Sequence, residues 1–210
     1  MLVLGRYSRI VDKIGVREIT MAYLLEQQLK RFGFKSLGNN VKISDKASIY
    51  NADQIEIGDN SRIDDFCVIS GKIRLGRFVH IAPMSLVAGG DLGVCMEDFS
   101  GLAYGVKLFT QSDDYTGKTL TNPTVDKKYK EETCARIHLG KHVIVGANSI
   151  VFPGVYLAEG CSVGAMTLVN KSTTPWGVYV GNPARRIKER KKDLLALEET
   201  FLKECDNAAI

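Results

Sequence analysis

Residues 139–170, LGKHVIVGANSIVFPGVYLAEGCSVGAMTLVN, repeat one pattern every six residues. Each unit begins with an aliphatic residue, a small residue often follows it, and another small residue commonly sits four places after the start. A fixed short period indicates a repeat architecture and is best sought before any other signal. The aliphatic starts in this stretch are Leu139, Val145, Val151, Leu157, Val163 and Val169.

The same period extends over residues 41–183, beginning imperfectly with Ile43, Ile49 and Ile55 in phase. A unit of six residues suits one short strand and one tight corner, so three units form a triangular coil of about 18 residues. Coils of this kind stack at the strand spacing of about 4.8 Å. Simple alternation in a β-sandwich would not keep the aliphatic residues in phase for so long, so an all-β parallel β-helix is expected.

Within each coil, the aliphatic and small residues are expected to point inward, with Gly, Asp and Asn at the corners, where positive φ is needed. Cys67 and Cys161 occupy small-residue positions and are predicted to be buried free thiols. The five cysteines include no Cys-x-x-Cys pair, so the sequence suggests neither a zinc site nor a disulfide framework.

Two flanking segments and one insertion depart from the repeat. Residues 1–40 contain apolar residues at helical spacing between Val16 and Phe32, which predicts a helix that caps the first coil or binds a partner. Residues 184–210 predict an amphipathic helix from Arg185 to Lys203 with a basic start. The polar insertion 111–136 is either a surface excursion or a functional loop, and its length favours function.

Composition narrows the class of protein. Of 210 residues, 45% are hydrophobic and 25% charged, as in ordinary globular proteins. No apolar stretch reaches the roughly 20 residues that span a bilayer, and the start does not resemble a signal peptide, so a cytoplasmic protein without a membrane span is expected. The net charge of +4 suits an anionic cofactor but does not argue for nucleic acid.

The repeat units from Leu139 to Val155, followed by Gly181-Asn182-Pro183-Ala184-Arg185, resemble the hexapeptide-repeat acyltransferases, in particular the maltose, galactoside and surface-polysaccharide sugar acetyltransferases. The resemblance implies a left-handed parallel β-helix, against the usual right-handed crossover rule. It also implies acetyl-CoA as co-substrate, no metal, and a homotrimer with clefts between subunits. The acceptor would be a sugar or a nucleotide-linked amino sugar in surface polysaccharide biosynthesis, acetylated on oxygen or nitrogen.

Acyl transfer needs a base for the proton of the acceptor, and the chain has three histidines that could serve. His80 lies between Val79 and Ile81, which take inward positions, so strand alternation turns His80 outward. His80 is the preferred base. His138, which closes the long loop, is the alternative, and His142 is expected to be merely exposed at a corner.

Asp113 and Asp114 begin the long loop and are candidates to orient the base through its second ring nitrogen. Counting repeats places His80 and Asp113 on different faces of one prism, so they would meet only across a subunit cleft. The alternative is that the two aspartates form a turn before Gly117. The loop of the maltose and galactoside enzymes commonly carries the catalytic histidine, and this loop contains none.

The resemblance also implies the cofactor site. The positions that match Ala147 and Ala165 line the pantetheine arm in similar enzymes, and Asn170, Lys171, Arg185 and Lys188 match positions near the 3′-phosphate and adenosine. Cationic side chains suit that phosphate. Trp176 either stacks on the adenine or, as preferred, caps the last coil.

Two other functions remain open from the sequence. A zinc enzyme of the carbonic-anhydrase type on the same prism would need three convergent histidines, and His138 and His142 do not have a suitable spacing for strands. A non-catalytic trimeric scaffold would need only the fold.

Overall fold

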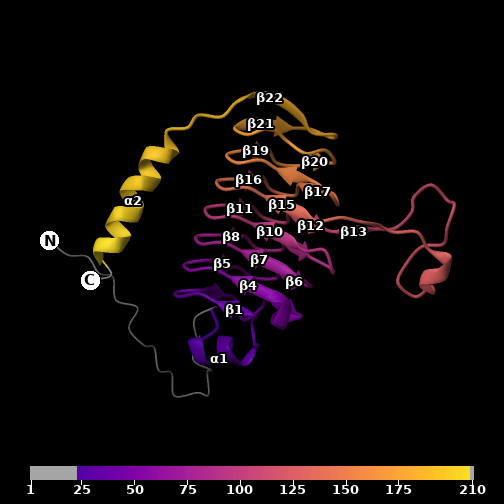
Figure 1. The fold of residues 1–210 in the computed structure, drawn as a ribbon, viewed down its shortest axis with the longest axis horizontal. Coiled ribbons are helices and arrows are strands. Elements are labelled where there is room, and N and C mark those ends of the chain that lie inside the picture. The colour runs from indigo at the N-terminus through magenta and orange to yellow at the C-terminus, as the bar shows by residue number, and fades with distance from the viewer. Residues whose placement is uncertain (1–22, 209–210) are drawn as a thin grey trace, which may run out of the picture.

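The computed structural model describes residues 23–208, and in these the chain winds as a parallel β-helix with three faces (Figure 1). Face 1 contains β1 (Ser36–Leu37), β4 (Ile55–Ile57), β7 (Ile73–Leu75), β10 (Val94–Met96), β15 (Ile137–Leu139) and β18 (Tyr156–Leu157). Face 2 contains β2 (Lys42–Ile43), β5 (Arg62–Ile63), β8 (His80–Ile81), β11 (Gly101–Leu102), β16 (Ile144–Val145), β19 (Ser162–Val163), β21 (Gly177–Val180) and β22 (Arg185–Glu189). Face 3 contains β3 (Ser48–Tyr50), β6 (Val68–Ser70), β9 (Leu86–Ala88), β12 (Lys107–Phe109), β17 (Ile150–Val151) and β20 (Leu168–Val169). A short 3-10 helix, η1 (Ala52–Gln54), precedes β4. The parallel β-helix predicted from the period is confirmed, and its left-handed winding stays the expectation from the resemblance.

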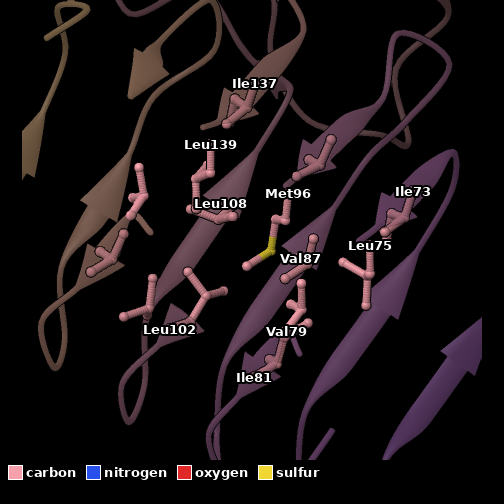
Figure 2. Packing of buried hydrophobic residues seen from close by; sticks show 14 of the residues in the cluster. Ile73, Leu75, Val79, Ile81, Val87, Met96, Leu102, Leu108, Ile137 and Leu139 are labelled. Atoms are coloured by element: carbon pink, nitrogen blue, oxygen red, sulfur yellow. The ribbon is translucent and has the colours of Figure 1, made fainter. Parts of the chain in front are cut away.

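The core is a set of columns in which each inward residue lies on its equivalent in the next coil (Figure 2). On face 2 the pairing of neighbouring strands aligns one such column, and none of its members is more than 3% exposed. Stacking identical positions at about 4.8 Å gives every coil the same apolar interior, which is why the aliphatic residues recur in phase. The members of this column are Ile43, Ile63, Ile81, Leu102, Val145 and Val163.

The small inward residues also bond the coils together. The hydroxyl of Ser149 donates to the carbonyl of Gly164 (2.8 Å) and accepts from the amide of Thr167 (3.1 Å). Ser61 makes the equivalent pair of bonds to Gly76 and Val79. Each buried hydroxyl therefore has partners, as burial requires. Cys67 and Cys161 occupy such positions and are fully buried free thiols, as predicted.

The corners were only partly predicted. Asn60 and Asn148 have positive φ as expected, but so do large residues such as Phe78 (57°), Phe99 (59°) and Met166 (57°). The left-handed conformation is costly for a residue with Cβ unless its surroundings stabilise it. At the corner between faces 1 and 2, here called the first corner, Phe78 and Phe99 stack with ring centroids 4.8 Å apart, so packing between coils offsets this cost.

The N-terminal helix is shorter than predicted within the described residues. α1 spans Glu26–Arg31, and residues 1–22, which contain part of the expected helix, lie outside the described residues. Leu29 of α1 is 4% exposed and belongs to the core, and the amide of Leu24 donates to the carbonyl of Ile43 (2.8 Å). This segment therefore covers the open end of the first coils, where unpaired strand edges would otherwise face water.

The expected helix from Arg185 to Lys203 is wrong at its start. Residues Arg185–Glu189 form β22, which pairs antiparallel with β21 and covers the edge of the last coil. The helix α2 begins only at Leu194 and ends at Ala208. It lies beside the first corner (Figure 1), where the Phe201 ring contacts that of Phe78 at 5.2 Å between centroids.

The long insertion projects from the corner between faces 3 and 1, here called the third corner, on the side away from α2 (Figure 1). Its base is closed by the antiparallel strands β13 (Gln111–Ser112) and β14 (Thr133–Cys134), and its only helical turn among the described residues is η2 (Lys127–Tyr129). No helix in residues 23–208 is long and apolar enough to cross a membrane. The division into parts 1–40, 41–183 and 184–210 as separate domains stays a prediction.

Candidate active site

His80 points away from the core, as strand alternation predicted. Its neighbours Val79 and Ile81 are 1% and 0% exposed, whereas the His80 side chain is 49% exposed. The imidazole is therefore held on the outer side of face 2 by two buried anchors and is open to a substrate.

The carboxylate beside His80 is Asp64, one coil earlier. The Nε2 atom of His80 lies 2.8 Å from Oδ2 of Asp64, whose side chain is only 6% exposed. Arg62 donates to both carboxylate oxygens (2.5 and 3.0 Å), and the Tyr23 hydroxyl donates to Oδ1 (3.0 Å). These four side chains, called the Asp64 cluster below, lie on face 2 at its side toward the corner with face 3.

Burial of Asp64 favours its neutral form, but hydrogen bonds from Arg62, His80 and Tyr23 outweigh this effect and lower the pKa of the carboxyl. The burial of Tyr23 itself, together with its hydrogen bond to Asp64, raises the pKa of the Tyr23 hydroxyl. An ionised Asp64 can only accept hydrogen bonds, so the Nε2 atom of His80 must carry a proton. In the neutral imidazole the lone pair is then on Nδ1, which leaves this atom able to take a proton from a substrate.

His138 forms the second histidine–carboxylate pair, on face 1. Its Nε2 atom lies 2.7 Å from Oε1 of Glu97, and its side chain is 29% exposed. Together with Arg74, Cys95 and Lys141 the pair lines a shallow hollow of about 340 Å³. Both His80 and His138 thus have the partner that a general base needs, and they lie on different faces.

The expectation that His142 is exposed is wrong. Its side chain is 7% exposed, its Nε2 atom lies 2.8 Å from Oε2 of Glu198 on α2, and its ring stacks on Phe99. Hydrogen bonds from Lys141 and His142 overcome the burial of Glu198 and lower the pKa of its carboxyl. The repeat does not determine the register of α2 against the prism, so the cover that α2 forms over the first corner could not be predicted.

Within one chain, neither loop aspartate contacts His80. Asp114 accepts from the amides of Thr116 (2.8 Å), Lys118 (3.0 Å) and Thr119 (3.1 Å), and hydrogen bonding from Thr116 and Thr119 lowers the pKa of Asp114 to about 2. This geometry matches the alternative in which Asp114 organises a turn.

Asp113 is less completely satisfied. Its Oδ2 atom accepts from the amide of Asn122 (3.3 Å), while its Oδ1 atom is buried without a hydrogen-bond partner among the described residues. The nearest cation is Lys130, whose Nζ lies 3.8 Å from Oδ1 and is bonded to Glu132. Asp113 therefore keeps acceptor capacity at the base of the loop.

The residues expected at the cofactor fall into two groups. Ala147 and Ala165 lie one above the other at the corner between faces 2 and 3, here called the second corner, where the Met166 amide donates to the Ala147 carbonyl (2.8 Å). Arg185 pairs with Val180 at the same end of β21. Asn170 and Lys171 follow β20 and lie across face 3, at the third corner. Within one chain, Ala147, Ala165 and Arg185 therefore lie together at the second corner. Asn170 and Lys171 lie at the third corner, apart from them.

The basic segment after residue 184 has mixed roles. Arg185 and Lys188 are exposed and form no ion pair within residues 23–208. Arg190 instead donates to the carbonyls of His142 (2.7 Å) and Gly160 (3.1 Å), which fixes the segment to the prism. Trp176 is 7% exposed and packs on Gly160, so it caps the last coil as preferred.

Sequence reasoning missed Asp64, Arg62 and Tyr23. Asp64 precedes His80 by 16 residues, close to one coil, and Arg62 pairs with His80 in register. Comparing residues one coil apart, rather than neighbours along the chain, would have found both. Tyr23 carries no such signal because it lies before the repeats. The described residues contain no group of three or more His, Cys, Asp or Glu side chains that could hold a metal ion.

Comparison with known proteins gives close relatives. The chain is 45% identical over 184 residues to the dTDP-4-amino-4,6-dideoxy-D-glucose acyltransferase of Escherichia coli, covering 86% of this chain and 95% of the relative. The structure of AntD, an N-acyltransferase from Bacillus cereus, in complex with dTDP and 3-hydroxybutyryl-CoA is 44% identical, covers 88% of this chain and 98% of AntD, and superposes with a TM-score of 0.87. A variant of AntD has been solved with dTDP-4-amino-4,6-dideoxyglucose and coenzyme A.

More distant structures share the fold alone. A maltose O-acetyltransferase from Clostridium difficile is 21% identical, with 80% of each chain covered and a TM-score of 0.51. No protein-family model matches the chain. The identity to the Escherichia coli and Bacillus cereus enzymes extends over nearly their whole length, and the repeats run through the same region. The chain therefore belongs to the hexapeptide-repeat acyltransferases.

Proposed function

We propose that the protein is an N-acyltransferase that moves an acyl group from a coenzyme A thioester to the amino group of a dTDP-linked amino deoxysugar. The observation that carries this proposal is the 45% identity to the Escherichia coli dTDP-4-amino-4,6-dideoxy-D-glucose acyltransferase over 95% of that enzyme. The complexes of AntD with dTDP and acyl-CoA support the same donor and acceptor classes. The product would serve surface polysaccharide biosynthesis, and acetyl-CoA is the simplest donor.

In the proposed reaction the neutral amino group attacks the carbonyl carbon of the thioester, and the carbon–sulfur bond breaks. Nδ1 of His80 takes the proton that the nitrogen loses and passes it to the departing thiolate, so coenzyme A leaves as the thiol. Asp64 stabilises the transient imidazolium, because its buried carboxylate lies 2.8 Å from Nε2. Arg62 and Tyr23 hold that carboxylate in place.

The expected path of the pantetheine arm favours His80 over His138 as the general base. Ala147 and Ala165 lie at the second corner, on the edge of face 2, and β8 of His80 is two strands below β16 on that face. Two strands correspond to about 10 Å, which an extended pantetheine arm running down this corner would span. His138 lies on face 1, which meets face 2 only at the first corner, beside α2.

The proposal of a homotrimer rests on the exposed residues of face 3. Its outward residues are mostly apolar: Val68 and Phe152 are each 36% exposed, and Leu86, Ile150 and Leu168 are partly exposed. A mostly apolar face, which Lys107 interrupts between Leu86 and Ile150, favours association, and a cyclic arrangement closes it. Such packing would bring the second corner of one subunit toward the third corner of its neighbour. Asn170, Lys171 and Asp113, at or near the third corner, would then lie beside the residues that the adjacent subunit contributes at its second corner.

The test is an assay with purified protein, dTDP-4-amino-4,6-dideoxyglucose and acetyl-CoA. The expected result is thiol release in step with a product that resists hydroxylamine, because an amide survives this treatment and an ester does not. Sedimentation of the same sample should give the mass of three chains. Thiol release with maltose but not with the amino sugar would contradict the proposal. A hydroxylamine-labile product would be an ester and would show that the acyl group is transferred to oxygen and not to nitrogen.

A further inference from the structure

Gly101 interrupts the outward row of side chains on face 2. It pairs with His80 on one side and with Ile144 on the other. In this row each other described residue carries a side chain, so the position directly beside the imidazole is the only bare one. The row consists of Lys42, Arg62, His80, Gly101, Ile144, Ser162 and Val178.

The fold does not require glycine at this position. The backbone of Gly101 is not in the left-handed region, and an added Cβ would find its nearest neighbour, the carbonyl oxygen of His80, at 3.6 Å, an ordinary contact. Gly160 shows the contrast: its φ is +66°, and an added Cβ would overlap the Trp176 ring. Glycine inside a strand weakens the strand and often marks a place where a ligand or another backbone comes close.

The missing side chain leaves a slot with defined walls. His80 and Ile144 stand two strands apart, which is about 9.6 Å, whereas carbon atoms pack at about 3.5–4.0 Å. One hydrocarbon chain therefore fits between them over the bare backbone of Gly101. The upper wall is the aliphatic side chain of Ile144, which is 48% exposed, and an apolar wall suits an acyl chain better than a sugar or a diphosphate.

We propose that Gly101 sets the size of the acyl group that the enzyme accepts, with the acyl chain lying across Gly101 between His80 and Ile144. The inference rests on the proposed function in one respect, because it assumes that the acyl-CoA thioester reaches His80 from the second corner. It goes further by assigning the selection of the donor to one position at which no contact within the described chain requires glycine.

The experiment measures binding of acetyl-CoA and butyryl-CoA to the full-length protein by calorimetry, without any acceptor. In Gly101→Ala the dissociation constant for butyryl-CoA should rise about 10–200-fold relative to that for acetyl-CoA, the range for one methylene-sized change in an apolar pocket. Gly101→Val should weaken both thioesters. Ser162→Val adds bulk in the same row, two strands above Gly101, and should leave the ratio of the two constants unchanged.

Two results would overturn the inference. Equal losses for acetyl-CoA and butyryl-CoA in Gly101→Ala would mean that the slot does not hold the acyl chain. A smaller sedimenting mass for Gly101→Ala would mean that the slot receives the backbone of a neighbouring subunit. Wild-type protein that binds the thioesters but acylates no amino sugar would instead contradict the proposed acceptor, and the binding ratio in Gly101→Ala would still decide the role of Gly101.

Discussion

The Nε2 atom of His80 and the Oδ2 atom of Asp64 lie 2.8 Å apart although 16 residues separate them along the chain. The coil period produces this contact, because β5 and β8 are neighbours and Arg62 pairs directly with His80. Asp64 follows β5 by one residue and is 6% exposed, so its carboxylate is fixed while the imidazole is open to solvent. A carboxylate fixed in this way holds the imidazole in one orientation through the hydrogen bond to Nε2.

The first prediction concerns the base. His80→Asn should lower turnover by about 10²–10⁴-fold, the usual contribution of a positioned acid–base group, and should leave coenzyme A binding intact because the inward columns are unchanged. His138→Asn is the matched control, since it removes the other exposed histidine–carboxylate pair, and should change turnover by only a few-fold. Thiol-release rates decide between them, and the reverse result would move the active site to face 1.

The second prediction concerns Asp64. Asp64→Asn should destabilise the protein by about 1–3 kcal/mol near neutral pH, because it removes the buried charge and replaces one of the two oxygens that accept from Arg62, His80 and Tyr23 by an amide donor. The pKa of Asp64 is lowered on folding, so its ionised form stabilises the protein above the unfolded pKa of about 3.9, and this stabilisation is lost as the pH falls below that value.

Urea unfolding of wild type and Asp64→Asn at pH 7 and below pH 4 measures this effect. The difference in unfolding free energy between the two proteins should shrink at the lower pH. A difference that stays constant across this range would show that the charge of Asp64 does not stabilise the fold.

The third prediction concerns the cofactor phosphate. If Lys171, Arg185 and Lys188 hold the 3′-phosphate, replacing any one of them by Met should cost about 1.5–3 kcal/mol of affinity for coenzyme A. The loss should be much smaller for dephospho-CoA, which lacks this phosphate. Calorimetry with both ligands gives the comparison, and Lys203→Met on α2 provides a surface control. Equal losses with the two ligands would place these cations elsewhere.

The fold could be predicted because the aliphatic residues that form its core recur every six residues along the chain. The six-residue spacing of Leu139, Val145 and Val151 is enough to predict the coil. Stacking such coils places equivalent inward residues in a column, as observed on face 2. The outward direction of His80 follows from the same alternation. Interactions one coil apart, such as that of His80 with Asp64, are also implied by the period, but only when residues about 18 apart are compared.

The remainder depends on packing that the repeat does not encode. Nothing in the period shows that Phe78 and Phe99 adopt positive φ, because their cost is offset by stacking on each other and by contact with Phe201 of α2. The burial of His142 has the same origin. The relation of Asp113 to His80 requires a neighbouring subunit and therefore stays a prediction.

The fourth prediction tests the packing of α2. Phe201→Ala should lower the free energy of unfolding by about 1–2 kcal/mol, since the ring is 42% exposed and contacts both Phe78 and Phe99. Leu197→Ala, on the same helix but 69% exposed, is the control and should stay within about 0.5 kcal/mol of wild type. Thermal unfolding of both variants gives the comparison, and equal effects would mean that α2 does not pack through Phe201.

The last prediction is that Gly101→Ala is stabilising. Glycine in a strand interior costs about 0.5–1 kcal/mol relative to alanine, and the added Cβ at Gly101 has room, so the free energy of unfolding should rise by about that amount. Gly160→Ala is the opposite control and should be clearly destabilised, because its φ is positive and the Trp176 ring fills the space. Thermal unfolding of the full-length variants measures both. If Gly101→Ala stabilises the fold and also weakens butyryl-CoA binding, the glycine serves binding and not stability. Such a conflict between activity and stability is typical of functional sites. A destabilised Gly101→Ala protein would show instead that the bare position serves the fold.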